Sequence, residues 1–147
     1  MLNLKIIFLL ITTSVFSQTT DYNVKKGYAA NGYDVVAYFE NTAIEGNKEI
    51  TTSFDGIKYK FSSQNNLNTF SKNPEKYIPQ YGGYCAYAVA VKGNKVSINP
   101  KAFEIRNGKL YLFYNAWGTN TLELWQKENT KILLKKADKN WEIIKAK

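Results

Sequence analysis

Two dipeptides typical of β-hairpin loops constrain the fold of this chain more than any other feature of its sequence. Asp55-Gly56 and Asn107-Gly108 each stand between two runs in which apolar and polar residues alternate. Such dipeptides favour two-residue hairpin loops, because both loop positions adopt positive φ. The loops also predict the register, because a one-residue slip would turn the apolar side chains to the other face. The expected cross-strand pairs are Phe54 with Ile57, Thr52 with Tyr59, Ile105 with Leu110, and Phe103 with Leu112.

The segments around these hairpins predict short helices and one further strand. Residues 34–39 are apolar, β-branched and aromatic, which indicates a buried strand. Ser62-Ser63 is a plausible N-cap, and Pro74 suits the first position of a second helix. Leu122 and Trp125 mark a later helix, and the last one carries an apolar stripe of Leu133, Leu134, Ala137, Trp141 and Ile144. The expected class is α+β: a small antiparallel sheet of hairpins with short helices and a C-terminal amphipathic helix.

The N-terminus has the pattern of a cleavable signal peptide over residues 1–17. Lys5 supplies the positive charge, residues 6–11 are apolar, and Val15-Phe16-Ser17 suits the cleavage site. The apolar run is shorter than the roughly 20 residues that span a bilayer, so no membrane span is expected after cleavage. Residues 18–26 are polar and predict a flexible leader, and residues 27–147 form the predicted domain. We therefore expect an exported protein, periplasmic or secreted.

Two residue counts exclude several kinds of chemistry. The chain has no His, so neither a Ser-His-Asp triad nor a Cys-His pair can form. Cys85 is its one Cys, which excludes an intramolecular disulfide. The net charge is +8, but Arg106 is the only Arg, so specific nucleic-acid reading through Arg forks is not expected. The Lys surplus indicates a solvated face, with contact to anionic cell-surface polymers as the alternative.

Several segments, in order, resemble the YHS domain. They are Gly32-Tyr33-Asp34-Val35-Val36-Ala37-Tyr38-Phe39, Asp55-Gly56-Ile57-Lys58-Tyr59-Lys60-Phe61-Ser62-Ser63 and Asn73-Pro74-Glu75-Lys76-Tyr77. Residues 79–87 and the hairpin at 107–112 resemble the exported bacterial branch of that family. The resemblance runs from about residue 27 to residue 141, which is nearly the whole predicted domain.

The resemblance implies the family's fold but not its usual metal chemistry. Metal-handling relatives have Cys at positions that correspond here to Ala37, Ser62 and Asn65 or Asn66, and often His where this chain has Asp55. Tyr59 and Ser63 are the same residues that the family carries at these positions. Soft metals need thiolate or imidazole ligands. We therefore expect no soft-metal site, and the sequence indicates no cofactor.

The segment 77–87 is the best candidate for a site, because it combines four Tyr, two adjacent Gly and the only Cys. It forms either a pocket wall with aromatic platforms and a thiol, or a Tyr-rich corner of the core in which Cys85 is a small buried hydrophobe. Asp34, the second candidate, contacts a ligand or braces its own segment. The ligand-binding candidates are Tyr33, Asp34, Tyr59, Tyr81, Gly82, Gly83, Tyr84, Cys85 and Tyr87; no catalytic residue and no metal ligand is assigned.

Three functions follow from these candidates. The first is an exported binding or accessory module of YHS type, with an unknown small ligand or protein partner. The second is a thiol-dependent enzyme or redox sensor at Cys85, although apolar neighbours favour a poorly nucleophilic thiol. The third is binding of a hard cation through oxygen ligands such as Asp34, Asp55 and Tyr.

Overall fold

Both predicted hairpins are present in the computed structural model, which describes residues 20–147. Strand β3 (Asn47–Phe54) pairs antiparallel with β4 (Ile57–Phe61), and β5 (Asn99–Arg106) pairs antiparallel with β6 (Lys109–Phe113). All four predicted cross-strand pairs are formed. Both residues of each loop have positive φ, which is the geometry that Asp-Gly and Asn-Gly favour.

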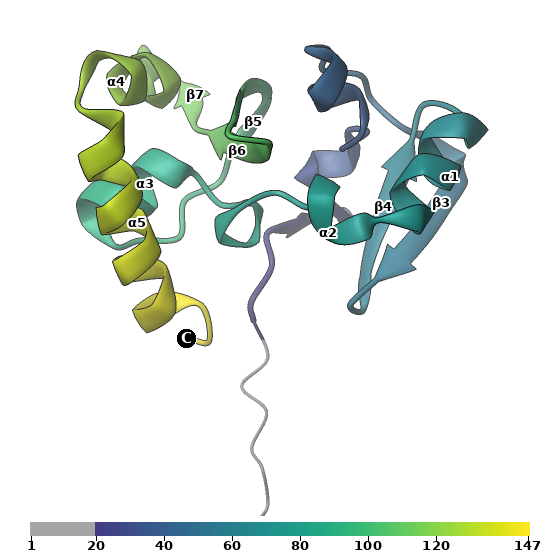
Figure 1. The fold of residues 1–147 in the computed structure, drawn as a ribbon, viewed down its shortest axis with the longest axis horizontal. Helices are drawn as coiled ribbons and strands as arrows, with labels where there is room; N and C mark the ends of the chain where they lie inside the picture. The colour runs from purple at the N-terminus through teal and green to yellow at the C-terminus, as the bar shows by residue number, and fades with distance from the viewer. Residues whose placement is uncertain (1–19) are drawn as a thin grey trace, which may run out of the picture.

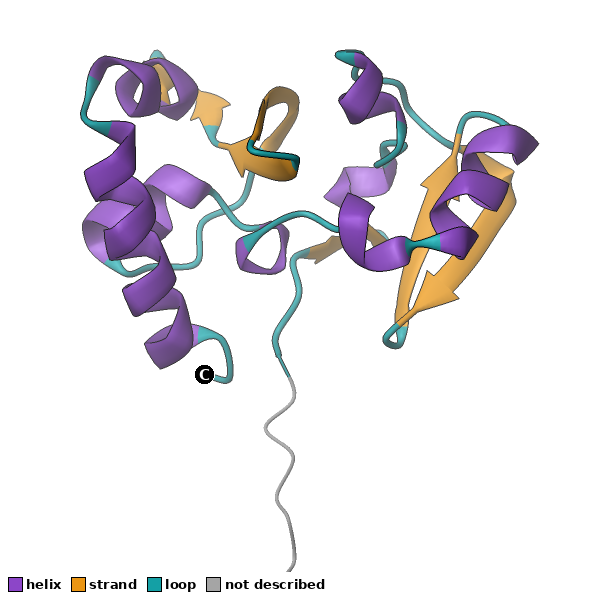
Figure 2. Cartoon of the chain, in the orientation of Figure 1, coloured by secondary structure: helices purple, strands orange, loops and turns teal. Residues whose placement is uncertain are grey.

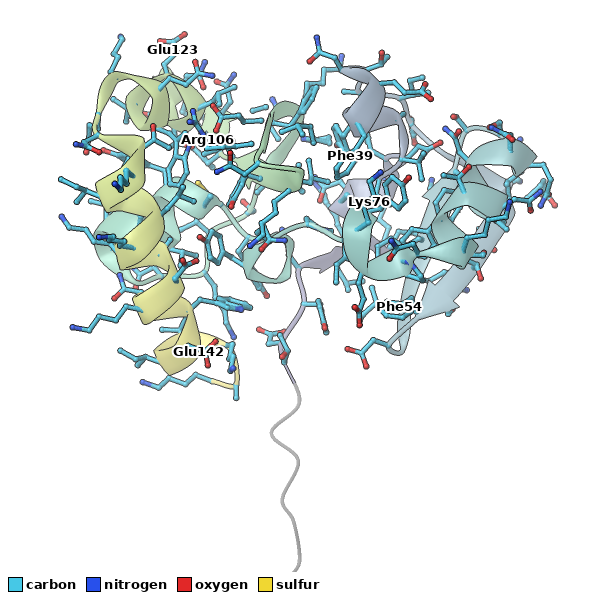
Figure 3. The ribbon with its side chains drawn as sticks, viewed as in Figure 1. Phe39, Phe54, Lys76, Arg106, Glu123 and Glu142 are labelled. Carbon is cyan, nitrogen blue, oxygen red and sulfur yellow. The ribbon has the colours of Figure 1, made fainter. Side chains whose placement is uncertain are left out.

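The two hairpins lie in separate halves of the molecule, whereas the sequence predicts that they share one sheet (Figure 1). Figure 3 shows Phe54 of the first hairpin and Arg106 of the second on opposite sides of the molecule. In the first half, β4 also pairs in parallel with β2 (Tyr28–Ala29), which pairs with β1 (Val24–Lys25). Helices α1 (Gln64–Lys72) and α2 (Pro74–Tyr77) follow β4. Ser63 caps α1 and Pro74 begins α2, as predicted. The α+β class is confirmed (Figure 2).

The second half contains three helices that share one hydrophobic core with the β5–β6 hairpin. They are α3 (Ala86–Lys92), α4 (Thr121–Lys127) and α5 (Thr130–Ile144), with a small hairpin of β7 (Asn115–Ala116) and β8 (Thr119–Asn120) before α4. The predicted stripe of α5 faces this second core, where Leu133 and Ala137 are buried. Fully buried Trp125 lies against Phe113, with ring centroids 5.5 Å apart.

The strand predicted over residues 34–39 is wrong. These residues form a turn that leads into the short 3₁₀-helix η2 (Ala37–Glu40). The Asp34 carboxylate accepts hydrogen bonds from the backbone N–H groups of Val36 and Ala37, so neither group is free to join a strand ladder. The apolar composition reflects burial alone, since Val35 and Tyr38 are both fully buried.

The leader predicted to be flexible is held in place over the part that the structure describes. Asp21 N–H donates to the Lys145 carbonyl oxygen, and Asn23 N–H donates to that of Gly82. Val24–Lys25 forms β1. These backbone bonds hold a segment whose polar side chains alone predicted no order.

The predicted signal peptide, residues 1–17, lies outside the described residues. Among residues 20–147, none of the helices combines the length and the apolar character needed to cross a membrane.

Candidate functional site

The candidate segment runs from one half of the molecule to the other and lies alongside β6. Pro79 and Cys85 form isolated parallel bridges with Leu110 and Leu112. Gln80 N–H donates to the Leu110 carbonyl oxygen at 2.9 Å, and Cys85 N–H donates to that of Val96 at 3.0 Å. The segment therefore acts as a partial extra strand, and its side chains project toward different hollows of the surface.

The short 3₁₀-helix η3 (Tyr81–Gly83) is a tight turn that depends on its glycines. Gly82 and Gly83 have φ of +60° and +80°, a region that disfavours side chains. A Cβ on Gly82 would lie 2.9 Å from both the Asp21 carbonyl oxygen and a ring carbon of Trp141. The absence of a side chain at Gly82 thus lets the N-terminal segment and α5 approach the turn.

Two tyrosines of the segment anchor neighbouring elements through their hydroxyl groups. Tyr81 donates to Asp138 of α5 at 2.9 Å, and Tyr84 donates to Asp21 at 3.0 Å. Burial and then the bond to Asp21 raise the pKa of Tyr84 to about 12. Burial likewise raises the pKa of Tyr81, with Asp138 adding to the effect. Both hydroxyls therefore stay protonated at neutral pH and act as hydrogen-bond donors.

Cys85 is completely buried, and its Sγ lies 3.3 Å from the Thr121 hydroxyl oxygen. Above it lies a hollow of about 560 Å³, which we call the Cys85 cavity. Three elements enclose this hollow: α3, the start of α4, and the β7–β8 hairpin. The residues that line it are Cys85, Tyr87, Ala88, Val91, Lys92, Val96, Tyr114, Thr119, Thr121 and Leu124.

The rim of the Cys85 cavity is apolar. Val91 is 48% exposed and Leu124 is 37% exposed, so two aliphatic side chains remain in water beside an unfilled hollow. The Tyr87 hydroxyl donates to Glu128, and this bond together with burial raises the pKa of Tyr87 to about 12. Lys92 is the one charged residue among those that line the cavity in the described part of the chain.

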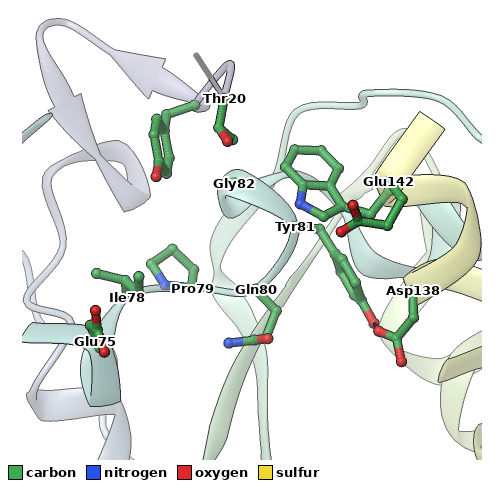
Figure 4. Close-up of a pocket in the computed structure, with 11 residues that line it drawn as sticks. Thr20, Glu75, Ile78, Pro79, Gln80, Tyr81, Gly82, Asp138 and Glu142 are labelled. Atoms are coloured by element: carbon green, nitrogen blue, oxygen red, sulfur yellow. Dashed lines mark hydrogen bonds between the residues drawn. The ribbon is translucent and has the colours of Figure 1, made fainter. Parts of the chain in front are cut away.

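A second hollow, of about 420 Å³, lies on the other side of the segment (Figure 4). We call it the acidic cleft. Its walls come from the N-terminal segment, the stretch from α2 to η3, and α5. The lining residues are Thr20, Tyr22, Glu75, Ile78, Pro79, Gln80, Tyr81, Gly82, Asp138, Trp141 and Glu142.

Asp34 lies in the first core, and its carboxylate is surrounded by donors. Oδ1 accepts from the N–H groups of Val36 and Ala37, and Oδ2 accepts from Ser62 N–H at 2.8 Å, Ser62 Oγ at 2.7 Å and Asn66 Nδ2 at 2.8 Å. The side chain is fully buried. These bonds stabilise the carboxylate without a cation and fix η2 against the start of α1.

Three positions at which the resemblance implies a ligand in metal-handling proteins lie around this carboxylate. Ala37, Ser62 and Asn66 are the residues that donate to Asp34, together with Val36. Their polar hydrogens point at the Asp34 oxygens, and none of these side chains is a thiol or imidazole. The residues therefore do not fit a soft metal ion. Within residues 20–147, no group of three or more Cys, Asp and Glu lies together in a way that could hold a metal.

The remaining candidates are divided between these regions. Tyr33 and Tyr59 belong to the first core with Asp34, and Tyr59 packs on Phe70 with ring centroids 4.8 Å apart. Tyr81 and Gly82 line the acidic cleft, whereas Cys85 and Tyr87 line the Cys85 cavity. Asp55 accepts a hydrogen bond from Tyr22, away from the contacts of Asp34.

Residues far along the chain complete both hollows, and the sequence analysis did not identify them. Thr121 and Leu124 of α4 close the Cys85 cavity, and Asp138 and Trp141 of α5 close the acidic cleft. Helical spacing predicts that α4 and α5 exist, but it carries no information on which parts of the chain they pack against.

Comparison with known proteins identifies a YHS domain at residues 35–81. This range comprises η2, the β3–β4 hairpin, α1 and α2, and it ends at the seam between the two halves. The Cys85 cavity lies beyond it. No curated protein matches the chain, and no solved structure matches it.

Proposed function

We propose that the chain is an exported binding module of YHS type that holds a small, mainly apolar molecule in the Cys85 cavity. The cavity itself carries this proposal. At about 560 Å³, it is within the usual size range of small-molecule sites. Its walls are mostly aliphatic and aromatic, with a few polar groups that could orient a ligand, including the Thr119 and Thr121 side chains.

The exposed rim supports an apolar ligand in particular. Val91 and Leu124 would lose contact with water on binding, and burial of apolar area contributes roughly 25 cal/mol per Å². Residues 35–81 then serve as the scaffold against which the second half is built. Cys85 shapes the floor of the cavity rather than reacting, because its Sγ is buried and contacts a hydroxyl rather than a cation.

The ligand class can be tested with N-phenyl-1-naphthylamine, a neutral apolar dye that fluoresces strongly when it leaves water. The purified protein is added to a fixed, micromolar concentration of the dye. At about 0.3 kcal/mol for each of the dye's 17 or so non-hydrogen atoms, binding should contribute roughly 5 kcal/mol, which is a Kd of about 0.2 mM.

Two exposed apolar residues provide a matched pair of variants. Val91→Asp places a charge on the rim of the cavity and should weaken dye binding at least about tenfold, since an apolar ligand would desolvate it. Ile143→Asp makes the same change at an α5 residue that is 55% exposed and does not line the cavity. It should leave binding unchanged. Equal loss in both variants, or no binding by the original protein, contradicts the proposal.

Export is tested separately on protein produced by its native host. The positive charge of Lys5, the apolar run at residues 6–11 and the Val15-Phe16-Ser17 segment support cleavage after Ser17. Mass spectrometry should find a chain that begins at Gln18, with or without cyclisation of that residue. A mature protein that retains Lys5 would contradict this part of the proposal.

A further inference from the structure

The acidic cleft differs from the rest of the molecule in its charge. The chain has 20 Lys and Arg against 12 Asp and Glu, yet the cleft is lined by Glu75, Asp138 and Glu142 and by no basic residue. A neighbouring hollow of about 590 Å³ shares Tyr22, Glu75 and Ile78 with it and adds Asp55. The two adjacent hollows are therefore lined by four of the 12 acidic residues in a protein of net charge +8.

The carboxylates stand on opposite walls of the cleft. Figure 4 shows Glu75 on one side, and Asp138 with Glu142 on the side formed by α5. Glu142 pairs with Lys145, and Asp138 accepts the Tyr81 hydroxyl, so each has a partner. Among the described residues, Glu75 has neither an ion pair nor a side-chain hydrogen bond. The arrangement leaves negative potential across an open space.

Aromatic rings form much of the remaining wall. Tyr81 and Trp141 both line the cleft, with ring centroids 6.2 Å apart in an edge-on arrangement. Gly82 lets the Trp141 ring lie directly against the η3 backbone. A cation above the face of Trp or Tyr is attracted by the ring, and aromatic rings combined with carboxylates are the usual surroundings of bound organic ammonium groups.

We propose that the acidic cleft is a second binding site, which takes a small organic ammonium ion between Trp141, Tyr81 and the carboxylates of Glu75 and Asp138. The aromatic walls distinguish this ligand from an inorganic cation, since a metal ion requires several oxygen ligands close together. The described residues contain no such group of three carboxylates. The site is distinct from the Cys85 cavity and does not depend on the function proposed for it.

Choline and 3,3-dimethylbutan-1-ol make a matched probe pair, because they have the same shape and differ in the charge of one atom. Each is titrated into purified ¹⁵N-labelled protein while the Trp indole N–H signals are followed by NMR. Choline should shift the Trp141 signal at millimolar concentration. It should leave the signal of Trp125 in place, since that indole is buried and donates to Glu104. Increasing salt should weaken the effect.

The variants test the role of the carboxylates. Glu75→Gln and Asp138→Asn should each raise the choline Kd about two- to fivefold, the usual range for an exposed charge pair. Asn at position 138 retains an acceptor for the Tyr81 hydroxyl. Glu49→Gln, at an exposed β3 residue outside the cleft, is the matched control and should change nothing.

Three results would overturn the proposal: equal binding of the neutral alcohol, choline shifts that spare Trp141, or a Kd that Glu49→Gln changes as much as Glu75→Gln. Saturable binding of Ca²⁺ at the cleft without any response to choline would also contradict it. None of these results bears on dye binding at the Cys85 cavity, so the two sites succeed or fail independently.

Discussion

Replacing Asp34 by Asn tests whether the buried carboxylate is a structural centre. The two side chains have nearly the same shape, but an amide has one acceptor oxygen and one NH₂ group that only donates, whereas both Asp34 oxygens accept, in five hydrogen bonds altogether. If the amide nitrogen faces Ser62 and Asn66, their side chains can turn to accept from it. The Ser62 backbone N–H can only donate, so it loses the carboxylate oxygen that accepts from it at 2.8 Å.

The opposite orientation leaves two backbone N–H groups, of Val36 and Ala37, without an acceptor. A buried donor without a partner costs about 1–3 kcal/mol, and the remaining bonds lose their charge assistance. Together these effects predict a loss of about 2–4 kcal/mol in the free energy of unfolding. At about 4 °C per kcal/mol for a domain of this size, Tm should fall by roughly 8–16 °C.

Urea unfolding followed by far-UV circular dichroism measures this loss. Asp55→Asn is the matched control, because Asp55 accepts one exposed hydrogen bond, from Tyr22, and its replacement should cost less than about 1 kcal/mol. If Asp34→Asn costs no more than Asp55→Asn, the carboxylate is not the centre of the first core, and a ligand-binding role for Asp34 would regain support.

Three further predictions follow from other contacts. Burial alone would raise the pKa of Glu104, but hydrogen bonds from Arg106 and Trp125 outweigh it and hold that pKa below the usual 4.5. The ionised carboxylate therefore stabilises the fold fully above about pH 4.5, and this stabilisation is lost as pH falls through the lowered pKa. Glu104→Gln should flatten the acid side of the curve of stability against pH, and an unchanged acid side would contradict this. Cys85→Ser should lower the free energy of unfolding in urea by about 1–2 kcal/mol, because Cys85 is buried. The Cys85 thiol should be alkylated far more slowly in folded protein than in urea, and fast alkylation of the folded protein would favour the thiol enzyme. Calorimetric titration with zinc or copper(I) should show no tight stoichiometric site, because the positions around Asp34 carry donors; submicromolar one-to-one binding would refute this.

Local signals predicted the elements of this fold well. The Asp-Gly and Asn-Gly loops determined both hairpin registers, and Ser63 and Pro74 marked two helix starts. Each of these features depends on interactions within a few residues, which a sequence displays directly.

Features that depend on distant contacts could not be predicted in the same way. Residues 34–39 have the composition of a strand, yet the Asp34 side chain takes the backbone N–H groups that a strand needs, and its other donors come from Ser62 and Asn66 about 30 residues away. The candidate segment was found because its Tyr, Gly and Cys are close in sequence. Its opposite walls, from α4 and α5, emerge only when the chain is folded.

The most direct test of the Cys85 cavity as a binding site is an NMR map of where a neutral apolar molecule binds. Indole, which dissolves to millimolar concentration, is titrated into ¹⁵N-labelled protein, and shifts of the backbone amide signals are followed along the chain. The account predicts saturable shifts at Ala88, Val91, Thr119 and Leu124. Shifts confined to residues outside the cavity, or none that saturate, would contradict it.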